Sequence, residues 1–382
     1  MNKLANKLNV FHVKDQTLLS KERVISVDAL RGFDMFWIMG GEGIFMGLDK
    51  VFHNKISGFI NEQLNHVEWF GFHFYDIIMP LFLFLVGVSM VYSFRKRLST
   101  EKSDVALWKH TIKRVIILWL LGMIVQGNLL TYDLNKFHFY ANTLQAIAAG
   151  YLIATVIILY LPVLHQITAT LGLLLLYWAV MALIPIGGNT LGAYTPDRNV
   201  AQFVDAFILG RFDDGYDYTW IVSSLNFGAT TMLGVFCGYI LQSRVSKIKK
   251  FRNFLIFGAV LIVLALVLDI WHPIIKKLWT SSFVLFSGGI CVLLLGAFYL
   301  IIDIWNVRKG TKWMIIIGSN AIFAYVVSHV FGDQLRAMAD VFINGLVPYI
   351  GNWFDTVTYA GGVLILFAAL RYMYKNKIYI KI

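Results

Sequence analysis

The chain contains about ten apolar runs of roughly 20 residues each, and these runs limit what it can fold into. A helix of that length crosses a hydrocarbon core of about 30 Å. The runs are continuously apolar rather than alternating, which argues against a transmembrane barrel of strands. They lie near 27–48, 73–94, 112–131, 139–161, 166–185, 219–242, 253–271, 280–302, 313–331 and 354–372. The sequence therefore predicts an all-α, polytopic integral membrane bundle of about ten transmembrane helices.

The composition of the chain argues against a soluble protein. The sequence is 58% hydrophobic and only 14% charged, whereas a soluble domain carries about 25% charge. A soluble core of this length cannot hide so much apolar surface. Two cysteines, Cys237 and Cys291, both fall in apolar runs, so no disulfide is implied. We expect residues 1–382 to form a single transmembrane domain.

The basic residues predict the orientation in the membrane. With the N-terminus in the cytoplasm, 25 of the 33 Lys and Arg residues fall on the inner side of the predicted spans. The eight others are Lys50, Lys55, Lys136, Arg198, Arg211, Lys276, Lys277 and Arg336. This bias predicts a cytoplasmic N-terminal arm (1–25) and a cytoplasmic tail (373–382). The net charge of +11 thus reflects topology and does not indicate nucleic-acid binding.

Charged residues inside a predicted span are costly, so each is a functional candidate. The first span contains Asp28, Arg31, Asp34 and Glu42. Asp28 and Arg31 are three residues apart and share a helix face, so they either form a structural ion pair or serve a site. Glu42 follows two glycines near the outer end. It has no evident local partner, and exposure to outer water is the alternative.

The segment between the first two spans carries a second group of polar residues. Residues 49–72 mix apolar and polar positions, as an amphipathic interfacial helix does. The end of this segment and the start of the second span contain His66, Trp69, His73 and Asp76. Trp69 suits the aromatic belt of a membrane interface. Asp76 needs a hydrogen-bond donor, which His73 or another span would supply.

Histidines gather at the outer ends of the predicted spans. Six of the nine lie there, at positions 53, 66, 73, 138, 272 and 329. Their spacing matches no zinc motif, so we expect no metal site. The more specific hypothesis is that one histidine acts as a general base on a substrate at the outer side of the membrane, because imidazole titrates near neutral pH. Asn142, Gln145 and Asn320 are further candidates, with hydrogen bonding between helices as the alternative.

Several of these motifs resemble one family of membrane enzymes. The opening RVISVDALRGFDMFWIMGGEG and the string from His66 through Trp69, Gly71 and Asp76 to Pro80 resemble the catalytic domain of heparan-α-glucosaminide N-acetyltransferase and its bacterial relatives, within a transmembrane acyltransferase superfamily. Weaker similarity follows in the blocks that begin at Asn142, Leu278 and Gly318. The resemblance runs over nearly the whole chain.

The resemblance implies an enzyme that moves acetyl from cytosolic acetyl-CoA to the amine of an amino sugar across a bacterial inner membrane. His66 matches the family's proposed active histidine, and Glu42 stands where animal members have a functional Asn. Glu42 or Asp76 would assist His66. Asn142 or Gln145 would stabilise the oxyanion. We assign Trp69, His73, Asn320 and His329 to the acceptor, and Arg31, Asp34, Lys113 and Arg114 to acetyl-CoA.

Two other functions fit the sequence. One is an O-acyltransferase that modifies envelope polysaccharide. The other is a transporter of amino sugars, with the membrane acids as proton relays. The partners expected are an amino-sugar or glycan acceptor and membrane lipid, with a homodimer left open as the assembly.

Overall fold

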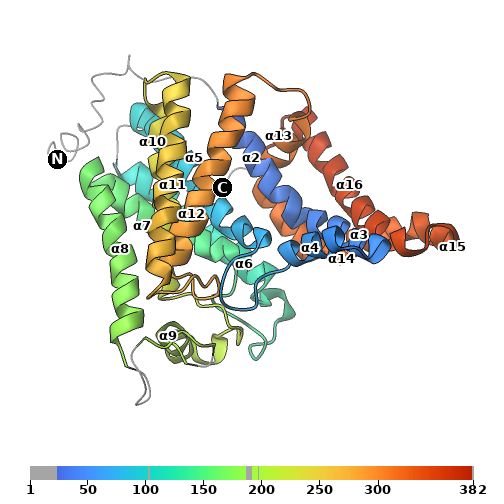
Figure 1. Cartoon of the computed structure of the whole chain (residues 1–382), viewed down its shortest axis with the longest axis horizontal. Helices are drawn as coiled ribbons and strands as arrows, with labels where there is room; N and C mark the ends of the chain where they lie inside the picture. The colour runs from blue at the N-terminus through green and yellow to red at the C-terminus, as the bar shows by residue number, and fades with distance from the viewer. Residues whose placement is uncertain (1–23, 102–103, 186–191, 197, 381–382) are drawn as a thin grey trace. The chain divides into compact units, whose positions relative to one another are not determined.

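The structure is a computed structural model that describes residues 24–101, 104–185, 192–196 and 198–380. The described residues are helical or irregular, and no β-strand occurs among them. This confirms the prediction of an all-helical chain with apolar helices suited to a membrane. Figure 1 shows the helices in order along the chain.

The longest helices coincide with the apolar runs of the sequence. The membrane-length helices are α5 (Ile78–Glu101), α6 (Asp104–Val125), α7 (Thr143–Tyr160), α8 (Val163–Leu183), α10 (Ser223–Gln242), α11 (Lys247–Asp269), α12 (Ser281–Phe298), α14 (Ala321–Ile343) and α16 (Phe354–Lys375). The shorter helices are α2 (Ile25–Phe36), α3 (Glu42–Phe52), α4 (Lys55–Leu64), α9 (Val200–Leu209), α13 (Lys312–Gly318) and α15 (Val347–Ile350).

Among the described residues, seven stretches are membrane-spanning candidates by length and composition, so the expectation of about ten is wrong by that measure. The run near 27–48 is not among the seven; it carries four charged residues and is interrupted at Gly40. The run near 112–131 lies largely on α6, whose first half carries Lys109, Lys113 and Arg114. The last two runs fall in one candidate stretch, Ala321–Lys375, which contains α14 and α16.

The helices group into two compact units. The first comprises Trp69–Gly71 and Met79–Gly296. Within it, α10 packs against α7 and α8, and α7 packs against α6. Close backbone approach holds this unit together: a Cβ at Gly87 would lie 1.9 Å from the carbonyl oxygen of Thr231. The glycine therefore lets α5 and α10 meet without a side chain between them.

The second unit comprises Val24–Glu68, Phe72–Ile78 and Ala297–Ile382. Here α2 packs on α13, and α16 packs on α14 and α3, as can be followed in Figure 1. Gly32 on α2 faces the backbone of Met314 on α13, where a Cβ would lie 1.7 Å from the carbonyl oxygen. Every candidate residue of the first span and of the segment 66–76, apart from Trp69, lies in this unit.

Candidate functional site

A break between α2 and α3 places Glu42. Between α2 and α3, residues Trp37–Gly41 form a wide helical turn, and Gly40 has φ 114°. An L-residue with a side chain rarely adopts that angle, whereas glycine does so at little cost. Wide turns of this kind inside helices are frequent at functional sites. The chain then resumes as α3, with Glu42 in its first turn.

His66 and Asp76 form a hydrogen-bonded pair. The imidazole Nδ1 of His66 lies 2.8 Å from Oδ1 of Asp76. The carboxylate is fully buried, whereas the His66 side chain is 41% exposed. Asp76 reaches this position because it belongs to a single 3₁₀ turn, Phe74–Ile77, at the entry to α5. The pair therefore has one shielded partner and one accessible partner.

Backbone groups fix the second oxygen of Asp76. Oδ2 accepts hydrogen bonds from the backbone N–H groups of His73 at 2.9 Å and Val67 at 3.3 Å. With Oδ2 held this way, Oδ1 points at the His66 ring. A carboxylate bound to Nδ1–H selects the imidazole tautomer whose acceptor lone pair is on Nε2. This arrangement orients His66 as a base.

Further polar and aromatic side chains of the second unit lie around His66 and Glu42. The His66 ring lies 4.9 Å from the ring of Tyr75. Tyr75 interacts electrostatically with Glu42, Asp34 and Tyr325. The Tyr325 ring stacks on His329 at 4.1 Å. These groups come from α2, α3, the turn before α5, and α14, which the sequence separates by up to about 300 residues.

A cavity of about 360 Å³ lies next to Glu42 and His329. Glu42, His329, Asp333, Arg336 and Tyr359 are among the residues that line it. Arg336 donates to the Tyr359 hydroxyl at 2.5 Å and pairs with Asp333. Glu42 Oε2 is buried and has no hydrogen-bond partner among the described residues. An unpartnered buried carboxylate oxygen is costly, so it marks a place where a donor is missing.

Asp34 has the same property in a stronger form. Its side chain is completely buried on α2, and neither carboxylate oxygen has a partner in the described chain. The positive charge of Arg31 favours the ionised form of Asp34. Arg31 itself donates to Asp28 at 3.4 Å, so the ion pair expected from the spacing is present. Asp34 therefore lies in the interior rather than at a solvent-facing phosphate site.

Other outer histidines have structural roles. In the first unit, His272 Nδ1 contacts the Tyr194 hydroxyl at 2.7 Å, and its Nε2 accepts from the backbone N–H of Ser281 at 2.9 Å. Burial lowers the pKa of His272 to about 3, so it stays neutral. His138 contacts the carbonyl oxygen of Asp213 at 2.8 Å. Of the six, His66 is the one held by a buried carboxylate among the described residues.

Asn142 and Gln145 form the N-terminal cap of α7 rather than pointing into a cavity. Asn142 Oδ1 accepts from the backbone N–H of Leu144 at 2.8 Å. Gln145 Oε1 accepts from the backbone N–H groups of Ala141 and Asn142, and its Nε2 donates to Phe139. Both side chains are fully buried. Such a reciprocal cap accounts for these amides structurally, and nothing in the geometry directs them toward a substrate.

The remaining predicted residues divide between the two units. Trp69 is buried in the first unit and donates from Nε1 to Tyr194 at 2.6 Å, so it is a packing residue there rather than part of an exposed belt. Lys113 is exposed on α6, and the guanidinium of Arg114 lies over the Tyr151 ring at 4.5 Å. His73 contacts the carbonyl oxygen of Asn65 at 3.0 Å.

Sequence reasoning missed three members of the site. The Tyr75 ring lies against His66, and Arg336 and Tyr359 line the cavity that contains Glu42. The available signals were that Tyr75 stands one residue before Asp76 and that Arg336 is one of few cations on the predicted outer side. Within the described residues, no group of three or more His, Cys, Asp or Glu side chains is arranged to hold a metal ion.

The chain matches no protein-family model and no curated protein.

Proposed function

We propose that the chain is a transmembrane acetyltransferase, which transfers acetyl from cytosolic acetyl-CoA to the amine of a glucosamine-type sugar on the periplasmic side of a bacterial inner membrane. The observation that carries the proposal is the His66–Asp76 pair, in which a buried carboxylate orients an accessible imidazole. An arrangement of this kind activates a nucleophile by taking its proton.

The chemistry assigned to His66 is proton transfer. An acceptor amine is mostly protonated near neutral pH and cannot attack until it loses a proton. His66 Nε2 takes that proton while Asp76 stabilises the imidazolium that forms. Acetyl-CoA supplies the thioester; nitrogen forms the amide bond, and the sulfur leaves as the thiolate and gains a proton. The ring of Tyr75 lies against His66 and limits its orientation.

The cavity lined by Glu42 supports an amine-bearing acceptor. Glu42 brings a buried carboxylate oxygen that lacks a donor, and an ammonium group supplies donors. Arg336 and Tyr359 line the same cavity and add donors for sugar hydroxyls. An amino sugar therefore matches this cavity better than a plain alcohol, which favours N-acetylation over O-acylation of a polysaccharide.

The test measures transfer of labelled acetyl from acetyl-CoA to glucosamine by the purified protein in detergent. We expect His66→Ala and His66→Gln to lose about 10²–10⁴ in rate, because neither replacement takes a proton near neutral pH. His165→Gln, which changes an exposed histidine of the first unit, is the matched control and should keep the parental rate. Near-parental transfer by His66→Gln would rule out His66 as the general base.

A transporter of amino sugars is the second candidate, and Asp34 favours it. A fully buried acid without a hydrogen-bond partner in the described residues is a typical proton-relay group. A transporter would take up labelled glucosamine into proteoliposomes without any acetyl-CoA. Uptake of that kind, lost in Asp34→Asn and retained in His66→Gln, would favour transport over acetylation.

A further inference from the structure

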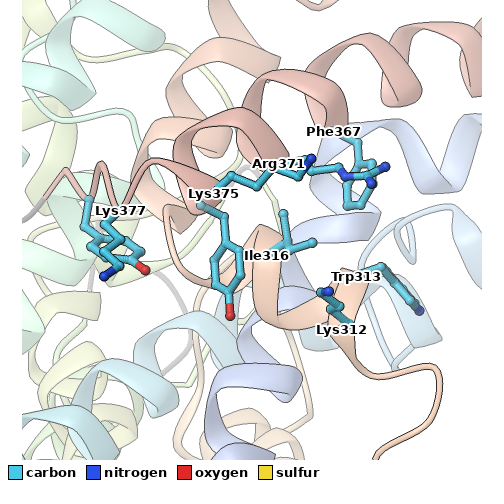
Figure 2. A pocket seen from close by; sticks show the side chains of 9 residues that line it. Lys312, Trp313, Ile316, Phe367, Arg371, Lys375 and Lys377 are labelled. Carbon is cyan, nitrogen blue, oxygen red and sulfur yellow. The ribbon is translucent and has the colours of Figure 1, made fainter.

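A second cavity of about 550 Å³ lies in the second unit, separate from the one lined by Glu42. Figure 2 shows Lys312, Trp313 and Ile316 of α13 on one side, with Phe367 and Arg371 of α16 on the other. Tyr374, Lys375, Lys377 and Tyr379 complete the lining. The two cavities have no lining residue in common.

All the charged side chains that line this cavity are basic. Four of the nine lining residues are Lys or Arg, and none is acidic. None of the four, Lys312, Arg371, Lys375 and Lys377, forms an ion pair with a described residue. Like charges around one space repel each other, so an anion placed there is stabilised by all of them.

Hydrogen bonds fix the segment after α16 that forms one side of the cavity. Asn320, which is buried, donates from Nδ2 to the carbonyl oxygen of Ile378 at 3.0 Å and accepts at Oδ1 from the backbone N–H of Ile380 at 2.9 Å. These two bonds hold the chain after α16 against the start of α14. Lys377, with φ 56°, makes the reversal that brings Tyr379 to the cavity. Asn320 is thus a positioning residue here, not an acceptor ligand.

We propose that this cavity binds a phosphate ester, with the Lys and Arg side chains on the phosphate oxygens and the aromatic rings against the apolar part of the ligand. Arg binds phosphate through two parallel hydrogen bonds, and Lys adds a point charge. Basic cavities between membrane helices on the cytoplasmic side bind phospholipid head groups. Soluble nucleotides carry the same chemistry, with a flat base for the aromatic rings. The inference is independent of the proposed acetyl transfer.

The test measures binding to the purified full-length protein in an uncharged detergent. The probes are short-chain phosphatidylglycerol, with phosphatidylcholine of the same chains as its reference, and ADP, with adenosine as its reference. The double variant Arg371→Ala/Lys375→Ala removes two exposed cations of the cavity. We expect it to weaken binding of the phosphate probe at least about tenfold, because two charge-assisted hydrogen bonds are lost.

The matched control is Arg244→Ala/Lys249→Ala, which removes two exposed cations of the first unit, one just before α11 and one in its first turn. Its affinity should stay within about twofold of the parent, since those charges lie outside the cavity. Cavity-dependent binding of phosphatidylglycerol assigns the phosphate to a lipid, and cavity-dependent binding of ADP assigns it to a soluble nucleotide. The proposal is overturned if neither probe binds, or if both double variants lose affinity equally.

Discussion

At the residue scale, the two partners of the His66–Asp76 pair differ in how exposed they are to solvent. Asp76 is enclosed and receives backbone N–H groups on one oxygen, so it keeps a fixed direction toward His66. His66 remains 41% exposed and reachable by a substrate. A rigid carboxylate behind an accessible imidazole lowers the cost of forming the imidazolium during proton transfer.

Asp76→Asn tests that relationship without removing the side chain. An amide NH₂ facing Nδ1 favours the opposite tautomer, in which Nε2 carries the proton and cannot accept another. We expect acetyl transfer to fall about 10²–10⁴-fold while the helical circular-dichroism spectrum is retained. Asp217→Asn, at a half-exposed ion pair with Lys277, serves as control and should transfer normally. Equal rates for Asp76→Asn and the parent would contradict the role of the carboxylate.

The sequence singled out His66 and Asp76, but it did not specify all of their partners. Asp76 needs a donor, and its spacing suggested His73 or a residue of another span, while the family resemblance offered Asp76 or Glu42 as the carboxylate that assists His66. The chain instead enters a 3₁₀ turn, so His73 contributes its backbone N–H and His66 contributes its ring. Tyr75 and Arg336 became site residues only through the folding of distant segments, which no local pattern encodes.

At the element scale, contacts between backbones position the helices of the second unit. Gly32 on α2 and Gly318 on α13 face each other's helices: a Cβ would lie 1.7 Å from Met314 O in one case and 2.4 Å from Asp28 O in the other. The obstructing atoms are backbone, so they cannot rotate away. The helices must separate to accommodate even a methyl group.

Gly32→Ala should therefore destabilise the protein strongly, by about 1–3 kcal/mol or more, as overpacking does. Gly58→Ala is its matched control, because a Cβ there meets nothing within 4 Å and alanine is the better helix former. Thermal unfolding of both variants in detergent measures the difference. Equal midpoints for the two would contradict the close approach of α2 to α13.

A separate element, the outer segment that contains α9, is held by buried carboxylates. Asp205 accepts from the backbone N–H groups of Trp220 at 2.6 Å and Ile221 at 2.9 Å. Asp214 accepts from the indole of Trp220 at 3.0 Å. Burial raises the pKa of Asp205 to about 7 and that of Asp214 to about 6.

The raised pKa values predict how stability changes with pH. An unfolded Asp titrates near pH 4, so between about pH 4 and 7 the folded protein binds more protons than the unfolded chain. This contribution to the free energy of unfolding is fully present below about pH 4 and is lost as pH rises through 7. The unfolding midpoint should fall from pH 5 to pH 8, and Asp205→Asn should reduce that fall. A midpoint that rises over this interval in the parent would refute the assignment.

At the scale of the whole molecule, hydropathy predicted the helical class but overcounted the spans. Seven stretches meet the length and composition of a membrane helix, because charges and the Gly40 break remove the first run and α6 carries too many cations in its first half. The single-domain organisation and the orientation remain predictions. The grouping into two units depends on contacts between distant helices, which apolar periodicity does not specify.

The distribution of basic residues predicts that both termini face the cytoplasm. A periplasm-active reporter fused after Ile382 should be inactive, and one inserted after Tyr216 in the outer segment should be active. A cytoplasm-active reporter at the same two positions should give the reverse pattern. Activity of the periplasmic reporter at the C-terminus would contradict the orientation.

Transfer of acetyl across a sealed membrane tests the central claim most directly. The protein is reconstituted into proteoliposomes of known orientation, with labelled acetyl-CoA on the side of the termini and glucosamine on the other side. We predict labelled N-acetylglucosamine on the far side with release of free CoA, and loss of both in His66→Gln. Glucosamine that crosses without acetylation, or label that appears equally with His66→Gln, would contradict the account.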